Sequence, residues 1–220
     1  MAEETPSTTD SRTVGRHQIR DVLQQMILDG RHRPGEKLVQ QQLARQFGVA
    51  QGVVREALLE LKAYGLVDTI DNRGVFVSDL NIQRLLDSFD VREMNEGLAA
   101  RLCCDRVTRT DLRDLTELAR AACLRGKQGK LMEMASLDRK FHTQLVRLSG
   151  NSMLVRLATN YRVLGKVIQL TRDPDEVLAE HLSVLKAIEE GQPDDAERLM
   201  RAHIRTGKRS LEQEVARGSY

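Results

Sequence analysis

The chain has 220 residues, a net charge of +2 and a mean hydropathy of −0.42, which place it among globular proteins of about one or two domains. No segment approaches the ~18 consecutive apolar residues that a membrane-spanning helix needs, which excludes an integral membrane protein. Aromatic residues make up only 3% of the chain, so aliphatic side chains must build the core, and this favours packed helices over a β-sandwich. The small net charge does not by itself indicate a nucleic-acid partner.

The three cysteines, Cys103, Cys104 and Cys123, have no CxxC spacing, which argues against a disulfide framework and against a thiolate zinc site. They predict a reducing, cytoplasmic environment. Residues 1–12 are polar and acidic and lack the apolar segment of a secretory signal, so we expect a disordered lead-in there.

Residues 13–79 are predicted to form a winged helix-turn-helix. Apolar residues recur at helical spacing in three segments, Val14–Leu28, Gln40–Phe47 and Gln51–Tyr64. The pattern then changes to that of two short strands joined by a turn, Leu66–Ile70 and Val75–Val77. Three helices closed by a hairpin are typical of this DNA-binding fold.

Residues 80–220 are predicted to form an all-helical antiparallel bundle. Its six expected helices are Ile82–Val107, Asp111–Arg125, Lys130–Leu148, Met153–Thr171, Pro174–Glu190 and Pro193–Ala216. Several boundaries have a chemical cause, because Asp173 can cap a helix whose first residue is Pro174, and Gly191 can end it.

The predicted winged helix-turn-helix carries a series of motifs in a fixed order. They are Arg33-Pro34-Gly35-Glu36-Lys37-Leu38, Leu43-Ala44, Phe47-Gly48-Val49, Val54-Arg55-Glu56-Ala57-Leu58, Leu61, Gly65-Leu66-Val67, Arg73-Gly74 and Val77. Over residues 14–79 this series resembles the DNA-binding domain of GntR-type transcription regulators. The resemblance implies a regulator that binds double-stranded DNA.

In such a domain the start of the third helix enters the major groove, where Gln51 and Arg55 can contact base edges and the backbone of Gly52 can approach a phosphate. Further candidate contacts to phosphates or the minor groove are Lys37, Arg45 and Arg73, with Gly74 beside it. The alternative for each basic residue is a solvated surface charge. The segment Ala50–Val53 departs from the family, which commonly has Ser-Arg-Thr-Pro there, and this leaves the operator sequence open.

The charge of this domain predicts that two copies act together. Residues 11–80 hold ten basic and eight acidic side chains, so a general electrostatic field cannot supply most of the affinity. We therefore expect a homodimer that binds a palindromic operator.

The helical region holds four polar residues on apolar helix faces. His142, His181 and His203 each fall within an apolar stripe, and Asp138 lies one turn before His142. A lone histidine in such a place is usually a hydrogen-bonded core residue. Three histidines and an aspartate together instead suggest a divalent ion such as zinc, nickel or manganese, which would also neutralise the carboxylate.

A second series of motifs supports the metal interpretation. It comprises Leu137-Asp138-Arg139-Lys140-Phe141-His142, Ser149-Gly150-Asn151, Glu180-His181-Leu182, Ala187-Ile188, Gly191 and Met200-Arg201-Ala202-His203. This series resembles the FadR C-terminal (FCD) domain of the FadR subgroup of GntR regulators. The resemblance implies that Asp138, His142, His181 and His203 hold a metal at the floor of an effector pocket, although the step from His142 to His181 is somewhat short.

An octahedral ion with four protein ligands would keep about two positions for water or the carboxylate of a small organic acid. Arg92 is the candidate cation for that effector and Asn160 a candidate hydrogen-bonding partner. The alternatives are a buried pair of Arg92 with Glu96 and a satisfied core amide at Asn160. The leading hypothesis is thus a transcription regulator, expected to be a repressor. A sensor of the ion itself is the alternative, and a metal-dependent hydrolase is disfavoured for lack of a further inward general base.

Overall fold

The computed structural model describes residues 15–28, 30–78, 82–164 and 172–217. The chain divides into two compact units, residues 1–79 and 80–220, and each is described by itself. Within the described residues the elements are nine helices and one three-stranded sheet. This confirms the predicted class, a winged helix-turn-helix followed by a helical bundle. The lead-in predicted at residues 1–12 lies outside the described residues.

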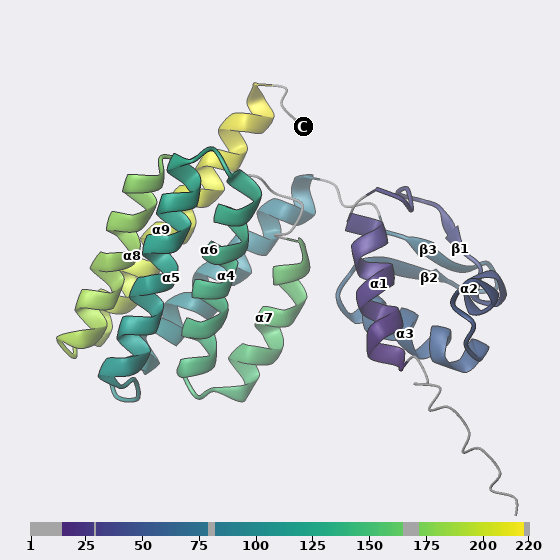
Figure 1. Cartoon of the computed structure of the whole chain (residues 1–220), viewed down its shortest axis with the longest axis horizontal. Coiled ribbons are helices and arrows are strands. Elements are labelled where there is room, and N and C mark those ends of the chain that lie inside the picture. The colour runs from purple at the N-terminus through teal and green to yellow at the C-terminus, as the bar shows by residue number, and fades with distance from the viewer. Residues whose placement is uncertain (1–14, 29, 79–81, 165–171, 218–220) are drawn as a thin grey trace, which may run out of the picture. The chain divides into compact units, whose positions relative to one another are not determined.

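Three helices form most of the N-terminal unit (Figure 1): α1 (Arg16–Leu28), α2 (Gln40–Phe47) and α3 (Gln51–Ala63). Their apolar stripes meet in a core in which Leu23, Val54 and Leu61 are fully buried. Helix α2 ends where predicted, because Gly48 adopts the left-handed conformation and its amide returns to the carbonyls of the last turn.

A small antiparallel sheet completes this unit, with the strand order β1 (Lys37–Leu38), β3 (Gly74–Val77) and β2 (Val67–Ile70). Strands β2 and β3 form the predicted hairpin, in which Val67 pairs with Val77 and Ile70 with Gly74. Strand β1 was not predicted, since two residues are too few to produce a strand-like alternation. It aligns Lys37 with Phe76 and thereby joins the chain before α2 to the wing.

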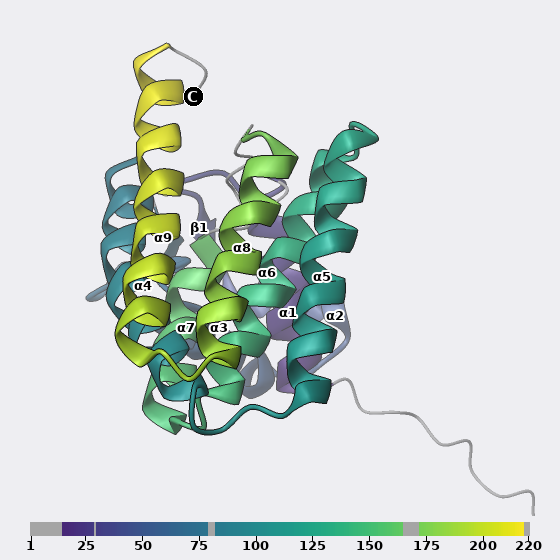
Figure 2. The ribbon, with the colours of Figure 1, turned by 90° about the vertical axis from the view of Figure 1, so that its left-hand side faces the viewer.

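The C-terminal unit is a bundle of six described helices: α4 (Ile82–Cys103), α5 (Arg109–Lys127), α6 (Leu131–Leu148), α7 (Ser152–Leu164), α8 (Pro174–Glu189) and α9 (Pro193–Ala216). Helix α8 lies between α5 and α9, and α4 packs against α9 (Figure 2). None of the helices in the described part of the chain is long and apolar enough to cross a membrane.

Helix α4 is shorter than predicted, and α5 begins earlier than predicted. Thr108 caps α5 by accepting a hydrogen bond from the amide of Asp111, whose carboxylate in turn accepts one from the amide of Thr108. This capping box starts α5 two residues earlier than predicted, whereas α4, which was expected to continue to Val107, ends at Cys103 and is followed by a turn. The predicted continuation of α7 to Thr171 lies outside the described residues.

Helices α4 and α9 approach each other closely through small buried residues. The buried residues of α4 include Gly97 and Ala100, and those of α9 include Ala196 and Gly207; Gly97 contacts Arg201 of α9 directly. A Cβ atom at Gly97 would lie 2.6 Å from Cγ of Arg201, so this side chain packs directly on the glycine. The pair forms one wall of the bundle that holds the candidate site.

Candidate functional site

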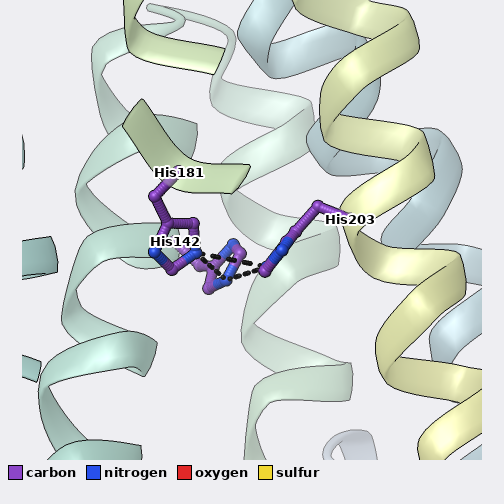
Figure 3. A group of neighbouring side chains, drawn as sticks. All are labelled: His142, His181 and His203. Carbon is purple, nitrogen blue, oxygen red and sulfur yellow. Dashed lines mark hydrogen bonds between the residues drawn. The ribbon is translucent and has the colours of Figure 1, made fainter. Parts of the chain in front are cut away.

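Three histidines from three helices meet inside the C-terminal unit (Figure 3). His142 comes from α6, His181 from α8 and His203 from α9. Their Nε2 atoms are 3.4 Å apart between His181 and His142, and 3.2 Å apart in each of the other two pairs. All three rings thus turn the same nitrogen toward one point, where they could hold a metal ion.

The surroundings of His181 and His203 favour neutral imidazoles. His181 is 0% exposed, and its ring stacks on Phe141 with the centroids 4.0 Å apart. Burial, together with the neighbouring histidines, lowers the pKa of His181 well below its ordinary value. Burial also lowers the pKa of His203, although its hydrogen bond with Glu180 acts in the opposite direction. A neutral imidazole has the lone pair that a divalent cation requires.

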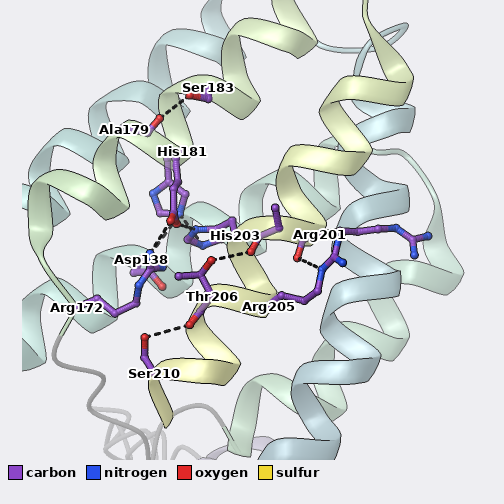
Figure 4. Close-up of polar contacts among 12 residues, drawn as sticks. Asp138, Arg172, Ala179, His181, Ser183, Arg201, His203, Arg205, Thr206 and Ser210 are labelled. Carbon is purple, nitrogen blue, oxygen red and sulfur yellow. Dashed lines mark hydrogen bonds and ion pairs between the residues drawn. The ribbon is translucent and has the colours of Figure 1, made fainter. Parts of the chain in front are cut away.

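Asp138 lies at the edge of this cluster (Figure 4). One carboxylate oxygen is 3.6 Å from Nε2 of His181, and the other is 3.7 Å from Nε2 of His142. Its side chain is half-buried, more exposed than its position on the apolar stripe of α6 implied. The four residues singled out from the sequence therefore lie together, with Asp138 on the more open side.

Two further carboxylates contact the outer nitrogens of the histidines. Glu180 lies 2.6 Å from Nδ1 of His203, and Glu96 lies 2.7 Å from Nδ1 of His142. Sequence analysis did not assign either residue to the metal site. Their signals were weak, because Glu180 was only the neighbour of a predicted ligand and Glu96 was considered only as a partner of Arg92.

Arg92, the candidate effector-binding cation, donates to the Glu96 carboxylate at 3.1 Å and lies over the ring of Phe89. Burial by itself would raise the pKa of Glu96, but the charges of Arg92 and His142 outweigh it and lower that pKa far below its ordinary value. The buried ion pair given above as the alternative is therefore present. The side chain of Asn160 lies outside the described part of the structure.

The candidate DNA contacts lie on two parts of the N-terminal unit. Gln51, Gly52 and Arg55 are exposed on the first turns of α3. In the wing, Nζ of Lys37 and Cζ of Arg73 each lie 5.9 Å from the centroid of the Phe76 ring.

Gly74 belongs to the same group in the wing. Its φ is +109°, and a Cβ atom there would lie 3.2 Å from Cε of Lys37, so glycine lets the lysine cross the strand. Arg45 is exposed near the end of α2. The unit thus presents basic side chains on both a helix and a wing, an arrangement that can contact a groove and the adjacent backbone.

Comparisons with known proteins agree with both units. The model of the FCD domain matches residues 87–206, and that of bacterial regulatory proteins of the gntR family matches residues 16–77. The Nta operon transcriptional regulator of Aminobacter aminovorans is 29% identical, over 81% of this chain and 86% of that protein. The "Probable D-xylose utilization operon transcriptional repressor" of Paenarthrobacter nicotinovorans is 28% identical, over 88% and 87%.

A solved structure has the same fold. The E. coli McbR/YncC structure superposes with a TM-score of 0.70 at 19% identity, covering 91% of this chain and 98% of that one. The matching families and the named relatives are transcription regulators and not enzymes.

Proposed function

Since the chain belongs to the GntR family, carries an FCD domain and is a DNA-binding transcription regulator, we propose that it is a repressor released by a small organic acid bound at a divalent metal. A named repressor among its relatives supports the direction of control. Residues 13–79 would be the DNA-binding domain, and residues 80–220 the domain for effector, metal and dimerisation. The division of the chain after Asp79 supports these boundaries.

The observation that carries the proposal is the convergence of three Nε2 atoms within 3.4 Å of one another, with Asp138 beside them. Imidazole nitrogens and a carboxylate oxygen form the ligand set of borderline divalent ions, zinc first and nickel or manganese next. The donor set therefore fits an ion held by Asp138, His142, His181 and His203. When bound, the ion would supply open coordination positions for carboxylate oxygens of the effector.

The charges around the histidines support an anionic effector. Among the described contacts, three carboxylates (Asp138, Glu96 and Glu180) stand against two guanidiniums (Arg92 and Arg172). These ion-paired groups sum to one net negative charge, and Arg139, whose charge also acts on Asp138, brings the sum to zero; a divalent ion would then make the site positive. A carboxylate ligand offsets that charge, which is why we favour an organic acid over a neutral ligand.

An exposed apolar stripe on α4 supports a homodimer. Val91, Met94 and Leu98 lie on one face of this helix and are 48%, 65% and 36% exposed. Exposed apolar residues in a row are typical of a protein contact surface. We expect Met94→Glu to convert the dimer to a monomer in sedimentation equilibrium while zinc binding is retained; a dimer of unchanged stability would place the interface elsewhere.

The proposed function is tested by gel retardation of the promoter region next to the gene. The protein is loaded with zinc, and a panel of small mono- and dicarboxylates is added. We expect at least one acid to release the DNA from the zinc-loaded protein and to have no effect on a His181→Ala variant. If the DNA is released when zinc is chelated and no acid has any effect, the protein is instead a sensor of the ion itself.

A further inference from the structure

In two of the three histidines, the ring nitrogen that faces away from the cluster centre, Nδ1, contacts a glutamate that is in turn paired with an arginine. Arg172 donates to Glu180 at 2.6 Å, and Glu180 lies 2.6 Å from Nδ1 of His203. In the same way Arg92 donates to Glu96 at 3.1 Å, and Glu96 lies 2.7 Å from Nδ1 of His142. One of these two series of contacts starts at Arg172, just before α8, and the other at Arg92 on α4, and they lead to histidines whose Nε2 atoms are neighbours.

Such a contact fixes where the imidazole carries its proton. A neutral imidazole has one N–H and one lone pair, and a carboxylate can only accept a hydrogen bond. A proton on Nδ1 that is donated to the carboxylate leaves the lone pair on Nε2. In His142 and His203 this is the nitrogen that faces the centre of the cluster, where the two Nε2 atoms lie 3.2 Å apart.

His181 differs from these two. Among the described residues no hydrogen bond or ion pair joins its buried Nδ1 to a carboxylate, and its ring stacks on Phe141. No carboxylate therefore selects its tautomer. The cluster thus holds two histidines whose Nδ1 lies against a carboxylate and one whose Nδ1 does not, and this third histidine serves as an internal reference for experiments on the other two.

We propose that Glu180 and Glu96 are positioning residues of the metal centre, each fixing its histidine in the tautomer whose Nε2 lone pair faces the ion. The inference rests on the metal site proposed above. The arginines contribute as well, because Arg172 orients Glu180 and Arg92 orients Glu96, and each arginine balances the charge of its carboxylate. The ion then meets two ligands that need no reorganisation of their protons.

Glu180 is the better residue for a test. Glu96 is 1% exposed, and its removal would leave Arg92 beside a buried gap, which also destabilises the fold. Glu180 is 31% exposed. In Glu180→Gln the shape is kept and the amide oxygen can still accept a hydrogen bond, whereas Glu180→Ala removes the contact. Glu189→Gln, an exposed change of the same charge at the end of α8, is the matched control.

The first measurement is zinc affinity by competition with a chelating dye. We expect Glu180→Ala to lower the affinity about 10- to 100-fold, the usual effect of losing an outer-shell partner. Glu180→Gln should lose less, and Glu189→Gln should equal the wild type. Wild-type affinity in Glu180→Ala overturns the inference. Equal losses in Glu180→Ala and Glu189→Gln overturn it too, since the effect would then be one of general charge.

The second measurement uses the metal-free protein and does not depend on zinc. Long-range ¹H–¹⁵N correlation spectra distinguish a proton on Nδ1 from one on Nε2. We expect the Nδ1–H pattern for His203 in the wild type and a mixture of tautomers in Glu180→Ala, an effect that a merely structural role of Glu180 would not produce. An Nε2–H pattern for His203 in the wild type overturns the inference.

The two proposals fail in different ways. A wild-type protein that binds no zinc removes the metal site and the inference with it. Zinc bound by the wild type, lost in His181→Ala and retained at full affinity in Glu180→Ala leaves the metal site intact and removes only the role of Glu180.

Discussion

The two units of this regulator place their candidate functional residues in opposite environments. Gln51 and Arg55 of the DNA-binding unit are exposed on α3, whereas His142 and His181 of the helical unit are buried. An exposed side chain adds little to folding and is free to serve its partner. A buried polar side chain must be compensated within the fold, so its neighbours reveal its chemistry. The helical unit therefore discloses more about its ligand than the DNA-binding unit discloses about its operator.

The sharpest test of this comparison is removal of a buried candidate ligand of the metal. We expect His203→Ala to abolish stoichiometric zinc binding, because it deletes one of three converging nitrogens and leaves Glu180 without its histidine. Elemental analysis of the purified variant measures this loss. DNA retardation by the effector-free variant reports separately on the N-terminal unit. Full metal retention would mean that the histidines are core residues and not ligands.

The core beneath the histidines should be the next most sensitive part. Phe141 is 0% exposed and stacks on His181. Phe141→Ala should lower the free energy of unfolding by about 3–5 kcal/mol, the cost of a large cavity in a packed interior. Urea unfolding measures the change, and Phe76→Ala, a partly exposed phenylalanine of the wing, should cost clearly less. Equal costs at the two positions would contradict the contrast between the units.

On the exposed side, the expected effect is confined to DNA. Arg55→Ala should weaken operator binding by about 1–3 kcal/mol, or roughly 5- to 150-fold, without a change in thermal stability. Gel retardation with specific and unrelated DNA measures the affinity. Arg31→Ala, another exposed arginine of the same unit, is the control. An equal loss of operator affinity in both variants would mean that Arg55 contributes only its positive charge and does not recognise a base.

The smallest expected effect concerns the cap of α5. Hydrogen bonds from the hydroxyl and amide of Thr108 lower the pKa of Asp111 below its ordinary value of 3.8. The cap therefore stabilises the fold fully above about pH 4, and the contribution is lost as the pH falls through the lowered pKa. Asp111→Asn should be less stable than the wild type at pH 6, and the difference should shrink at about pH 3. A difference independent of pH would exclude the charge of Asp111 as its cause.

Element boundaries could be predicted wherever a cap or breaker stands. The predicted bounds Gln40–Phe47 and Pro193–Ala216 equal those observed, because Gly48 and Pro193 impose them locally. The end of α4 was misplaced by four residues, because the turn at residues 104–106 contains no glycine or proline that would mark it in the sequence. Strand β1 was missed because its pairing with β3 depends on residues far away in the sequence.

For the candidate site, helical periodicity was enough to select the three histidines. It placed His142, His181 and His203 on inward faces, and all three are buried. Periodicity could not find the contact of Glu180 with His203, because that contact joins α8 to α9 and depends on how the two helices cross. The operator contacts remain predictions for a related reason: an exposed side chain has no neighbours within the fold that identify its partner.

The close approach of α4 and α9 has a consequence for the dynamics of the protein. With Arg201 packed on Gly97 and small residues at the contact, neither helix can leave the other without opening the centre of the bundle. Backbone amides of this pair should then exchange with solvent only through global unfolding, while those near the helix ends exchange by local fraying. Helix α4 carries Glu96 and α9 carries His203, so we expect the backbone amides at these two positions to exchange more slowly than those near the ends of the two helices.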